Sequence, residues 1–237
     1  MLKGQEGFKF RCYDKHIMSD FKKPSDHYRD LKQYVSASHG RKHICMVYSD
    51  KEQQITALSE YFSAGFKLGQ RCLYVSDTMT ATFVRNVLKR TGMNIDALEK
   101  NGSLCMLTPT QAYLTGEKFN LDSTIERVVE LIENSRADGF TGLRGAGDST
   151  WVLQTALTCK DILTYESSIS SLYEQYPFTG LCLYDETRFH PKAIKMLIQT
   201  HPAVLKDGQI VENPGYLPPA KFLPNLKSEN HIPLSIC

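Results

Sequence analysis

Short apolar runs alternate along this chain with longer stretches in which apolar residues recur every three or four positions. The first run, at 43–48, ends in Ser49-Asp50, and residues 51–68 then carry one apolar stripe at helical spacing. The same alternation continues to about residue 199. Strands that alternate with helices predict an α/β protein, with a mostly parallel central sheet and helices on both faces.

The remaining elements follow from the same two periodicities. Further strands are predicted at 71–76, 103–107, 139–144 and 178–184. Further helices are predicted at 80–90, with Phe83, Val87 and Leu88 facing inward, and at 121–137, 160–176 and 191–199. A small hairpin is expected at 203–211, around Asp207-Gly208.

Three segments are expected along the chain. Residues 1–40 are interpreted as an N-terminal extension that packs loosely or mediates association, with a short amphipathic helix at 26–38. Residues 41–219 form the main domain. Residues 220–237 are polar and interrupted by prolines, which predicts a flexible tail.

Composition argues against several classes of partner. The 237 residues are 41% hydrophobic and 23% charged, which is ordinary for a globular protein, and the net charge of +2 gives no strong field to recruit nucleic acid or an anionic membrane. No apolar run approaches the roughly 20 residues of a membrane span, and the N-terminus has no signal-peptide core, so we expect a cytoplasmic protein. The seven cysteines include no CxxC pair, and we expect buried thiols in a reducing compartment.

The first strand-to-helix turn, Tyr48-Ser49-Asp50-Lys51-Glu52, has the position of a phosphate-binding loop but not its chemistry. A phosphate loop is rich in glycine, because its backbone N–H groups must approach the phosphates closely. This turn has no glycine, and it carries two carboxylates that would repel phosphate oxygens. The turn therefore predicts an α/β domain that does not hold a triphosphate in the usual way.

Ligands of open α/β sheets bind beyond the carboxyl ends of the strands, which directs attention to the residues there. Arg144, followed by Gly145-Ala-Gly147-Asp148 and Trp151, could line a pocket; the alternative is a glycine-rich turn with an ordinary ion pair. The predicted ligand-binding residues are Tyr48, Arg144, Asp148, Trp151, Glu166, Asp185 and Arg188.

Glu166 lies on the apolar face of its predicted helix, with Ile162, Ile169 and Tyr173. A carboxylate among apolar neighbours needs a partner, and Arg144 is the natural candidate. The pair is either a structural salt bridge or part of a pocket in which the carboxyl pKa is raised.

His43 and Cys45 are two positions apart on one strand, so both side chains project to the same side. Imidazole and thiolate suit a soft metal ion or a haem, although two ligands are only half of a tetrahedral set and a packed histidine is the alternative. No nucleophile elbow or paired-carboxylate spacing is present, so no enzyme activity and no obligatory cofactor are predicted.

Seven short motifs, in order along the chain, resemble one family. They are His43-Ile-Cys-Met-Val-Tyr, Gly69-Gln-Arg-Cys-Leu-Tyr-Val, Gly142-Leu-Arg-x-x-Gly-Asp-x-x-Trp151, Tyr165-Glu166, Leu183-Tyr-Asp-x-x-Arg-Phe189, Thr200-His-Pro and Asn213-Pro-x-Tyr-x-Pro-Pro219. Together they resemble the MEDS domain, the methanogen/methylotroph, DcmR-type sensory domain, from about His43 to Pro219.

The resemblance implies a RecA/KaiC-like three-layer sandwich that lacks the phosphate loop. It also implies an archaeal or bacterial sensory domain for small hydrocarbon derivatives such as C1 compounds, attached to histidine kinases or to regulators of transcription. The matching positions are His43, Cys45, Arg144, Asp148, Trp151, Tyr165, Glu166, Asp185 and Arg188. This chain departs from the family pattern at Asp148, where a glutamate is expected, and no output module is recognised in the sequence.

We therefore expect a cytoplasmic, non-catalytic domain that binds a small molecule and acts on a separate signalling partner, without contacting nucleic acid or a membrane. Three alternatives stay open. The first is a residual nucleotide-binding, ATPase-like domain, and the second is a metal or haem redox sensor that uses His43 and Cys45. The third is a structural module that forms a homodimer.

Overall fold

A seven-stranded sheet forms the centre of the molecule. The computed structural model describes residues 29–37, 42–115, 118–226 and 232–235. Neighbouring strands pair in parallel, except for an antiparallel hairpin at one edge. This arrangement confirms both the mostly parallel α/β sheet and the predicted hairpin. Across the sheet the order is β3 (Leu104–Leu107), β2 (Arg71–Val75), β6 (Leu143–Asp148), β7 (Phe178–Asp185), β1 (Lys42–Tyr48), β8 (Ala203–Lys206) and β9 (Gln209–Glu212).

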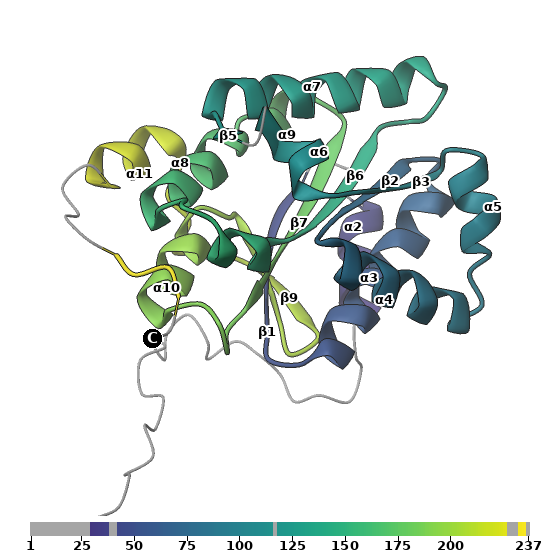
Figure 1. The fold of residues 1–237 in the computed structure, drawn as a ribbon, viewed down its shortest axis with the longest axis horizontal. Helices are drawn as coiled ribbons and strands as arrows, with labels where there is room; N and C mark the ends of the chain where they lie inside the picture. Colours follow the sequence, from purple (N-terminus) through teal and green to yellow (C-terminus); the bar gives the residue numbers. More distant parts are fainter. Residues whose placement is uncertain (1–28, 38–41, 116–117, 227–231, 236–237) are drawn as a thin grey trace, which may run out of the picture.

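Helices cover both faces of this sheet and produce the predicted three layers (Figure 1). One face packs against α2 (Arg29–Ala37), α3 (Lys51–Lys67), α4 (Thr78–Arg90) and α5 (Ile95–Lys100). The other face packs against α7 (Leu121–Ala137), α8 (Cys159–Ile169), α9 (Leu172–Gln175), α10 (Pro191–Gln199) and α11 (Pro219–Leu226). We call these the α3 face and the α8 face.

Alternation along each strand decides which face a side chain reaches. In β1, Ile44 and Met46 pack in the core of the α3 face, whereas Cys45 and Val47 pack in the core of the α8 face. Successive strand residues point to opposite faces, and both faces of a parallel sheet are buried. His43 therefore lies on the same face as Cys45, where it meets Glu166 of α8.

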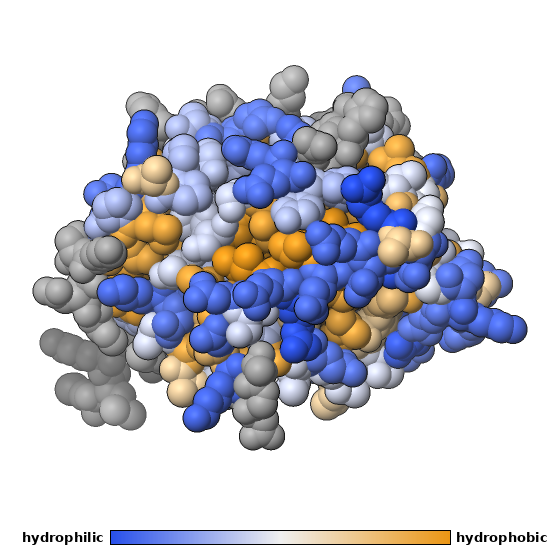
Figure 2. Space-filling view, turned by 90° about the horizontal axis from the view of Figure 1, so that it is seen from above, coloured by the Kyte–Doolittle hydropathy of each residue, from blue (hydrophilic) through white to orange (hydrophobic). Residues whose placement is uncertain are grey.

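Several short elements between β3 and α8 were not predicted. They complete the α8 face beside α7. On the surface seen from above, apolar side chains gather in a central stretch (Figure 2). Each element is too short to show a hydrophobic periodicity in the sequence. They are α6 (Pro109–Tyr113), the antiparallel pair β4 (Leu114–Thr115) and β5 (Lys118–Phe119), and the 3-10 helix η1 (Ser149–Gln154).

The fourth predicted strand, at 139–144, is wrong in position. The strand β6 spans Leu143–Asp148, so its glycines lie within the sheet and not in a turn after it. A Cβ at Gly145 would lie 3.3 Å from the Phe178 ring, and a Cβ at Gly147 would lie 2.9 Å from the Tyr113 hydroxyl. Close approach of these rings to the strand, and not a turn, explains the two glycines.

Two helix predictions also need correction. The helix expected at 160–176 is divided into α8 and α9, with the break at 170–171. Phe83 was expected to face inward, yet its side chain is 45% exposed. Val87 and Leu88 pack against the core as predicted, together with Val84.

Both ends of the described chain pack more closely than expected. The helix predicted near 26–38 is present as α2, but its Leu31 and Val35 are fully buried and do not pack loosely. The expected flexible tail begins with α11, whose Phe222 and Leu226 are buried in the core of the α8 face. The rest of the predicted N-terminal extension lies outside the described residues. Within the described part, each helix is too short or too polar to cross a bilayer.

Candidate functional site

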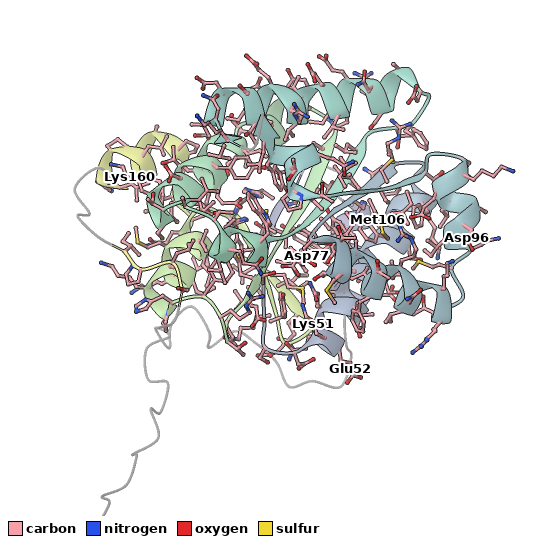
Figure 3. All side chains as sticks on the ribbon, viewed as in Figure 1. Lys51, Glu52, Asp77, Asp96, Met106 and Lys160 are labelled. Carbon is pink, nitrogen blue, oxygen red and sulfur yellow. The ribbon has the colours of Figure 1, made fainter. Side chains whose placement is uncertain are left out.

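The first turn of the sheet uses its polar groups internally. Asp50 caps α3, because its Oδ1 accepts a hydrogen bond from the Gln53 backbone N–H at 2.9 Å. The Ser49 N–H donates to Gln53 Oε1 at 3.1 Å. Lys51 and Glu52 begin the helix at this end of the sheet (Figure 3). A helix N-terminus that already has a carboxylate cap offers a poor site to a phosphate.

Asp148 joins the ends of β1 and β6 and is almost fully buried. Its Oδ2 accepts hydrogen bonds from Gln54 Nε2 at 2.7 Å and from the Tyr48 hydroxyl at 3.4 Å. Its Oδ1 accepts from the Thr150 N–H and hydroxyl at 2.9 and 2.6 Å, and Lys51 Nζ is 3.8 Å away. Burial, followed by the Asp148 charge, raises the pKa of the Tyr48 hydroxyl. These contacts make Tyr48 and Asp148 parts of a closed polar network.

Arg144 does not pair with Glu166, so that prediction is wrong. Alternation in β6 places Arg144 on the α3 face, fully buried, whereas Glu166 lies across the sheet. Arg144 Nε donates to Gln70 Oε1 at 2.7 Å, and its Nη2 donates to the Val35 carbonyl at 3.3 Å. The guanidinium lies over the Tyr61 ring, 4.7 Å from its centroid. Arg144 therefore connects β6 to α2 and to Gln70, which follows α3.

Asp185 and Arg188 lie at the turn that follows β7, away from the pocket of the α8 face. Asp185 Oδ1 accepts hydrogen bonds from the Thr187 N–H at 2.9 Å and from its hydroxyl at 2.6 Å. Arg188 is exposed. Sequence position alone placed both residues near a ligand, and their contacts indicate a turn.

The α8 face contains a pocket with aromatic walls, lined in part by α7 and α8. Tyr113 stacks on Trp151 with ring centroids 5.6 Å apart, and Tyr165 meets Tyr113 and Phe119 edge to face. The cavity has a volume of about 70 Å³. Of the predicted ligand-binding residues, Asp148, Trp151 and Glu166 line it. Arg144, Asp185, Arg188 and Tyr48 are not among its lining residues.

Glycines of the two central strands make this space. Gly145, Gly147 and Gly180 line the pocket where other residues would project a side chain into it. A Cβ at Gly180 would overlap the Tyr173 hydroxyl, whose ring lies against the strand. The glycines therefore allow aromatic rings to approach the sheet closely and leave space between them.

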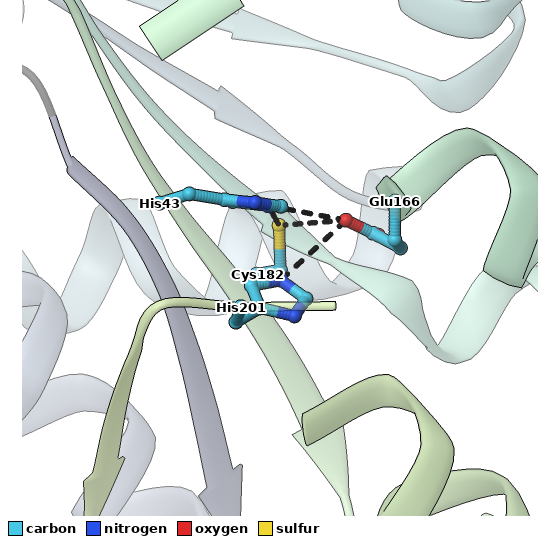
Figure 4. A group of neighbouring side chains, drawn as sticks. All are labelled: His43, Glu166, Cys182 and His201. Atoms are coloured by element: carbon cyan, nitrogen blue, oxygen red, sulfur yellow. Dashed lines mark hydrogen bonds and ion pairs between the residues drawn. The ribbon is translucent and has the colours of Figure 1, made fainter. Parts of the chain in front are cut away.

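At the inner end of the pocket, four polar side chains converge from four places in the chain (Figure 4). They are His43 of β1, Glu166 of α8, Cys182 of β7 and His201, which follows α10; we call them the His-Glu-Cys cluster. Glu166 Oε2 lies 3.3 Å from His43 Nε2, 3.5 Å from His201 Nε2 and 3.4 Å from Cys182 Sγ. Cys182 Sγ lies 3.5 Å from His43 Nε2. Glu166 and Cys182 also line the pocket.

Neighbouring groups hold the cluster in position. The Tyr184 hydroxyl donates to Glu166 Oε1 at 2.6 Å, and the Tyr173 ring stacks on His43 with centroids 4.6 Å apart. Burial lowers the pKa of both His43 and His201 to about 3, so both imidazoles are neutral at pH 7. Burial and then the Glu166 charge raise the pKa of the Cys182 thiol.

Sequence reasoning found only half of this cluster. His43 and Glu166 were both singled out, but Cys45, the expected thiol ligand of a metal, lies outside the group that the structure brings together. Cys182 replaces it from the neighbouring strand, in register with Cys45. His201 is part of the Thr200-His-Pro motif, yet nothing in its spacing connects it to β1. Only the pairing of β1 with β7 and β8 reveals the set.

Comparison with known proteins agrees with the resemblance seen in the motifs. The family described as MEDS, the MEthanogen/methylotroph, DcmR Sensory domain, matches residues 42–202, more than half of the chain. The matched region includes all of the pocket and all of the His-Glu-Cys cluster. A search of curated proteins finds no match. The chain therefore belongs to the MEDS family of sensory domains.

Proposed function

We propose that this chain is a non-catalytic input domain that binds a small, largely apolar molecule in the aromatic pocket of the α8 face. Its family is one of sensory domains, which supports a role in signal input. The observation that carries the proposal is the pocket itself, where aromatic walls lead to Glu166 and Cys182 at the inner end. Apolar walls with a few convergent polar groups are typical of small-molecule sites.

The walls favour a particular class of ligand. Tyr113, Phe119, Trp151 and Tyr165 offer faces and edges of rings to an apolar or weakly polar group. A methylated or otherwise hydrocarbon-derived C1 compound, with one polar atom directed to Cys182, fits this arrangement. The family resemblance implies ligands of the same class. An anionic ligand is disfavoured, because the Glu166 carboxylate at the inner end of the pocket would repel it.

Signalling requires that the ligand change the populations of two conformations that a partner distinguishes. We propose a separate partner, such as a histidine kinase or a transcription regulator, in a cytoplasmic system. The pocket lies between α7, α8 and the sheet, so a ligand that favours one spacing of these layers alters the surface of the α8 face. The chain itself carries out no reaction in this proposal.

The test is a thermal-shift and calorimetry series with methylated amines, methanol, methyl thioethers and chlorinated methanes. A ligand at about 100 times its Kd stabilises the folded state by about 2.7 kcal/mol. Trp151→Ala should weaken binding about tenfold, because it removes the ring stacked on Tyr113. Phe83→Ala is the matched control, since Phe83 is an exposed aromatic residue on the opposite face.

Two results would contradict the proposal. One is a Trp151→Ala variant that binds every active compound as tightly as the wild type. The other is magnesium-dependent ATP binding at millimolar nucleotide, which would favour the residual ATPase alternative instead. The capped first turn leads us to expect no such binding.

A further inference from the structure

We propose that the His-Glu-Cys cluster binds one divalent transition-metal ion at the inner end of the pocket, with zinc as the ion that fits best. The ligands are His43 Nε2, His201 Nε2, Glu166 Oε2 and Cys182 Sγ. This inference is independent of the proposed pocket ligand. It rests on the spacing of the four atoms, on the direction of their lone pairs and on their charge.

Four of the six separations among these atoms are those of the corners of a metal-centred tetrahedron, and all four atoms lie within 4.8 Å of one another. With bonds of about 2.0–2.1 Å to nitrogen and oxygen and about 2.3 Å to sulfur, corners lie about 3.3–3.4 Å apart, or about 3.5–3.6 Å where one is sulfur. The observed separations are 3.3 and 3.5 Å from oxygen to the two nitrogens, 3.4 Å from oxygen to sulfur and 3.5 Å from sulfur to His43. These four separations agree with the tetrahedral values to within about 0.2 Å, the tolerance expected of a metal site, and His201 Nε2 lies within 4.8 Å of both His43 and Cys182.

The two oxygens of Glu166 show that the separations from the imidazole nitrogens are not those of strong hydrogen bonds. Oε1 accepts a hydrogen bond of 2.6 Å from the Tyr184 hydroxyl. Oε2 has its three cluster neighbours at 3.3–3.5 Å. A charge-assisted N–H···O bond would bring nitrogen to about 2.7–2.9 Å from this oxygen. The gap around Oε2 matches the space that a shared ion occupies.

The lone pairs of both imidazoles point into that gap. His201 Nδ1 lies 2.7 Å from the Leu197 carbonyl, which only accepts, so Nδ1 carries the proton and Nε2 a lone pair. His43 Nδ1 lies 2.9 Å from the Ser170 hydroxyl, which itself donates to the carbonyl of Glu166 or of Thr200. Ser170 therefore accepts from His43, whose Nε2 also presents a lone pair.

Without a cation, this arrangement places acceptors against each other in a buried site. Two imidazole lone pairs and a carboxylate oxygen converge, and the Cys182 S–H is a weak donor that can satisfy only one of them. Buried acceptors without donors are costly. A divalent ion satisfies all of them, and it balances the charges of the Glu166 carboxylate and a Cys182 thiolate. The Nδ1 contacts to Ser170 and Leu197 are the outer hydrogen bonds that orient metal-binding histidines.

The donor set selects the class of ion. Two nitrogens, one oxygen and one sulfur in a tetrahedral arrangement suit zinc, and iron(II), cobalt(II) and nickel(II) bind the same ligand types. All four ligand atoms lie within 4.8 Å of one another, which is room for one ion and not for a haem. Because Glu166 and Cys182 also line the pocket, the ion would be within reach of a pocket ligand.

The test uses the full chain, freed of metal with a chelator and titrated with Zn²⁺ and separately with Co²⁺. We expect one ion per chain, and for cobalt an intense tetrahedral d–d spectrum with a thiolate-to-metal charge-transfer band. Cys182→Ser should remove that band. His201→Ala should weaken metal affinity more than the loss of an outer hydrogen bond does, which typically costs about 10–100-fold. Cys45→Ser is the matched control, since this buried thiol of the same face lies outside the cluster.

Each outcome decides the proposal. Stoichiometric binding with a thiolate band that Cys182→Ser removes and Cys45→Ser retains supports it. Binding that Cys45→Ser abolishes, a cobalt spectrum without a thiolate band, or less than one ion per chain at micromolar metal would overturn it. Should the variants fail to fold, the stoichiometry and the cobalt spectrum of the wild type still decide, and neither depends on the identity of a pocket ligand.

Discussion

Arg144 on the α3 face and Glu166 on the α8 face are both buried, and the two are surrounded in opposite ways. On the α3 face, the Arg144 guanidinium donates to Gln70 and to the Val35 carbonyl and lies over the Tyr61 ring, while its Nη1 is buried without a hydrogen-bond partner among the described residues. On the α8 face, the Glu166 carboxylate meets two imidazole lone pairs beside a pocket. A charge whose neighbours complement it supports the fold, whereas a charge whose neighbours compete with it indicates a missing cation and a binding role.

The largest expected effect follows from breaking the complementary side. Arg144→Met should lower the free energy of unfolding by about 2–4 kcal/mol, because it leaves the Gln70 amide and the Val35 carbonyl without a buried donor. Denaturant unfolding measures this loss. Metal binding should persist in the folded fraction, since Arg144 lies across the sheet from the cluster. A stable Arg144→Met protein that no longer binds metal would contradict this assignment, because Arg144 would then act in metal binding and not in stability.

A slightly smaller effect is expected where the α8 face is most crowded. Gly180→Ala places a methyl group against the Tyr173 hydroxyl, and the Tyr173 ring stacks on His43. We expect a loss of about 1–3 kcal/mol in unfolding free energy and weaker metal binding, because the displaced ring moves His43. Gly147→Ala is the matched control, since its Cβ meets the Tyr113 hydroxyl at 2.9 Å and not the Tyr173 ring. Equal effects of the two substitutions would show that Tyr173 does not position His43.

Asp148 sharpens the comparison on the α3 side of the strand end. Asp148→Asn replaces an acceptor with an amide group that faces the donors Gln54 and Thr150, so we expect a loss of about 1–2 kcal/mol in thermal or denaturant unfolding. Ligand and metal binding should change little, because the carboxylate faces this network and not the cluster. A selective loss of ligand binding at unchanged stability would return Asp148 to the site.

The smallest effect is expected at the edge where the sequence placed a ligand. Arg188→Ala should change the unfolding free energy by no more than about 0.5 kcal/mol, because Arg188 is exposed and follows a turn closed by Asp185. Calorimetry with an active pocket compound should give the wild-type affinity. A large drop in affinity would show that the ligand reaches the turn after β7.

Periodicity was sufficient for most of the fold. The helices α7 and α10 begin and end where the apolar spacing predicted, and β1 and β7 differ from prediction by about one residue at an end. It failed at β6, because glycine is typical both of turns and of strands that rings approach closely, and only the positions of Phe178 and Tyr113 distinguish the two. That error also moved Arg144 from the amino end of its strand to the carboxyl end.

The site was predictable only residue by residue. Helical spacing placed Glu166 on an apolar face and strand spacing placed His43 on the same side as Cys45, and both statements agree with the structure. Which partners they meet depends on the order of strands in the sheet, and local sequence does not contain that order. The pairing of β1 with β7 brings Cys182 beside His43, and its pairing with β8 brings His201.

The most direct measurement of the central claim is X-ray absorption at the metal edge of the zinc-loaded full chain. We expect one sulfur ligand at about 2.3 Å from the zinc ion and three nitrogen or oxygen ligands at about 2.0–2.1 Å. The sulfur shell should vanish in Cys182→Ser and remain in Cys45→Ser. A wild-type spectrum with only nitrogen and oxygen ligands, or one in which Cys45→Ser removes the sulfur, would contradict the account.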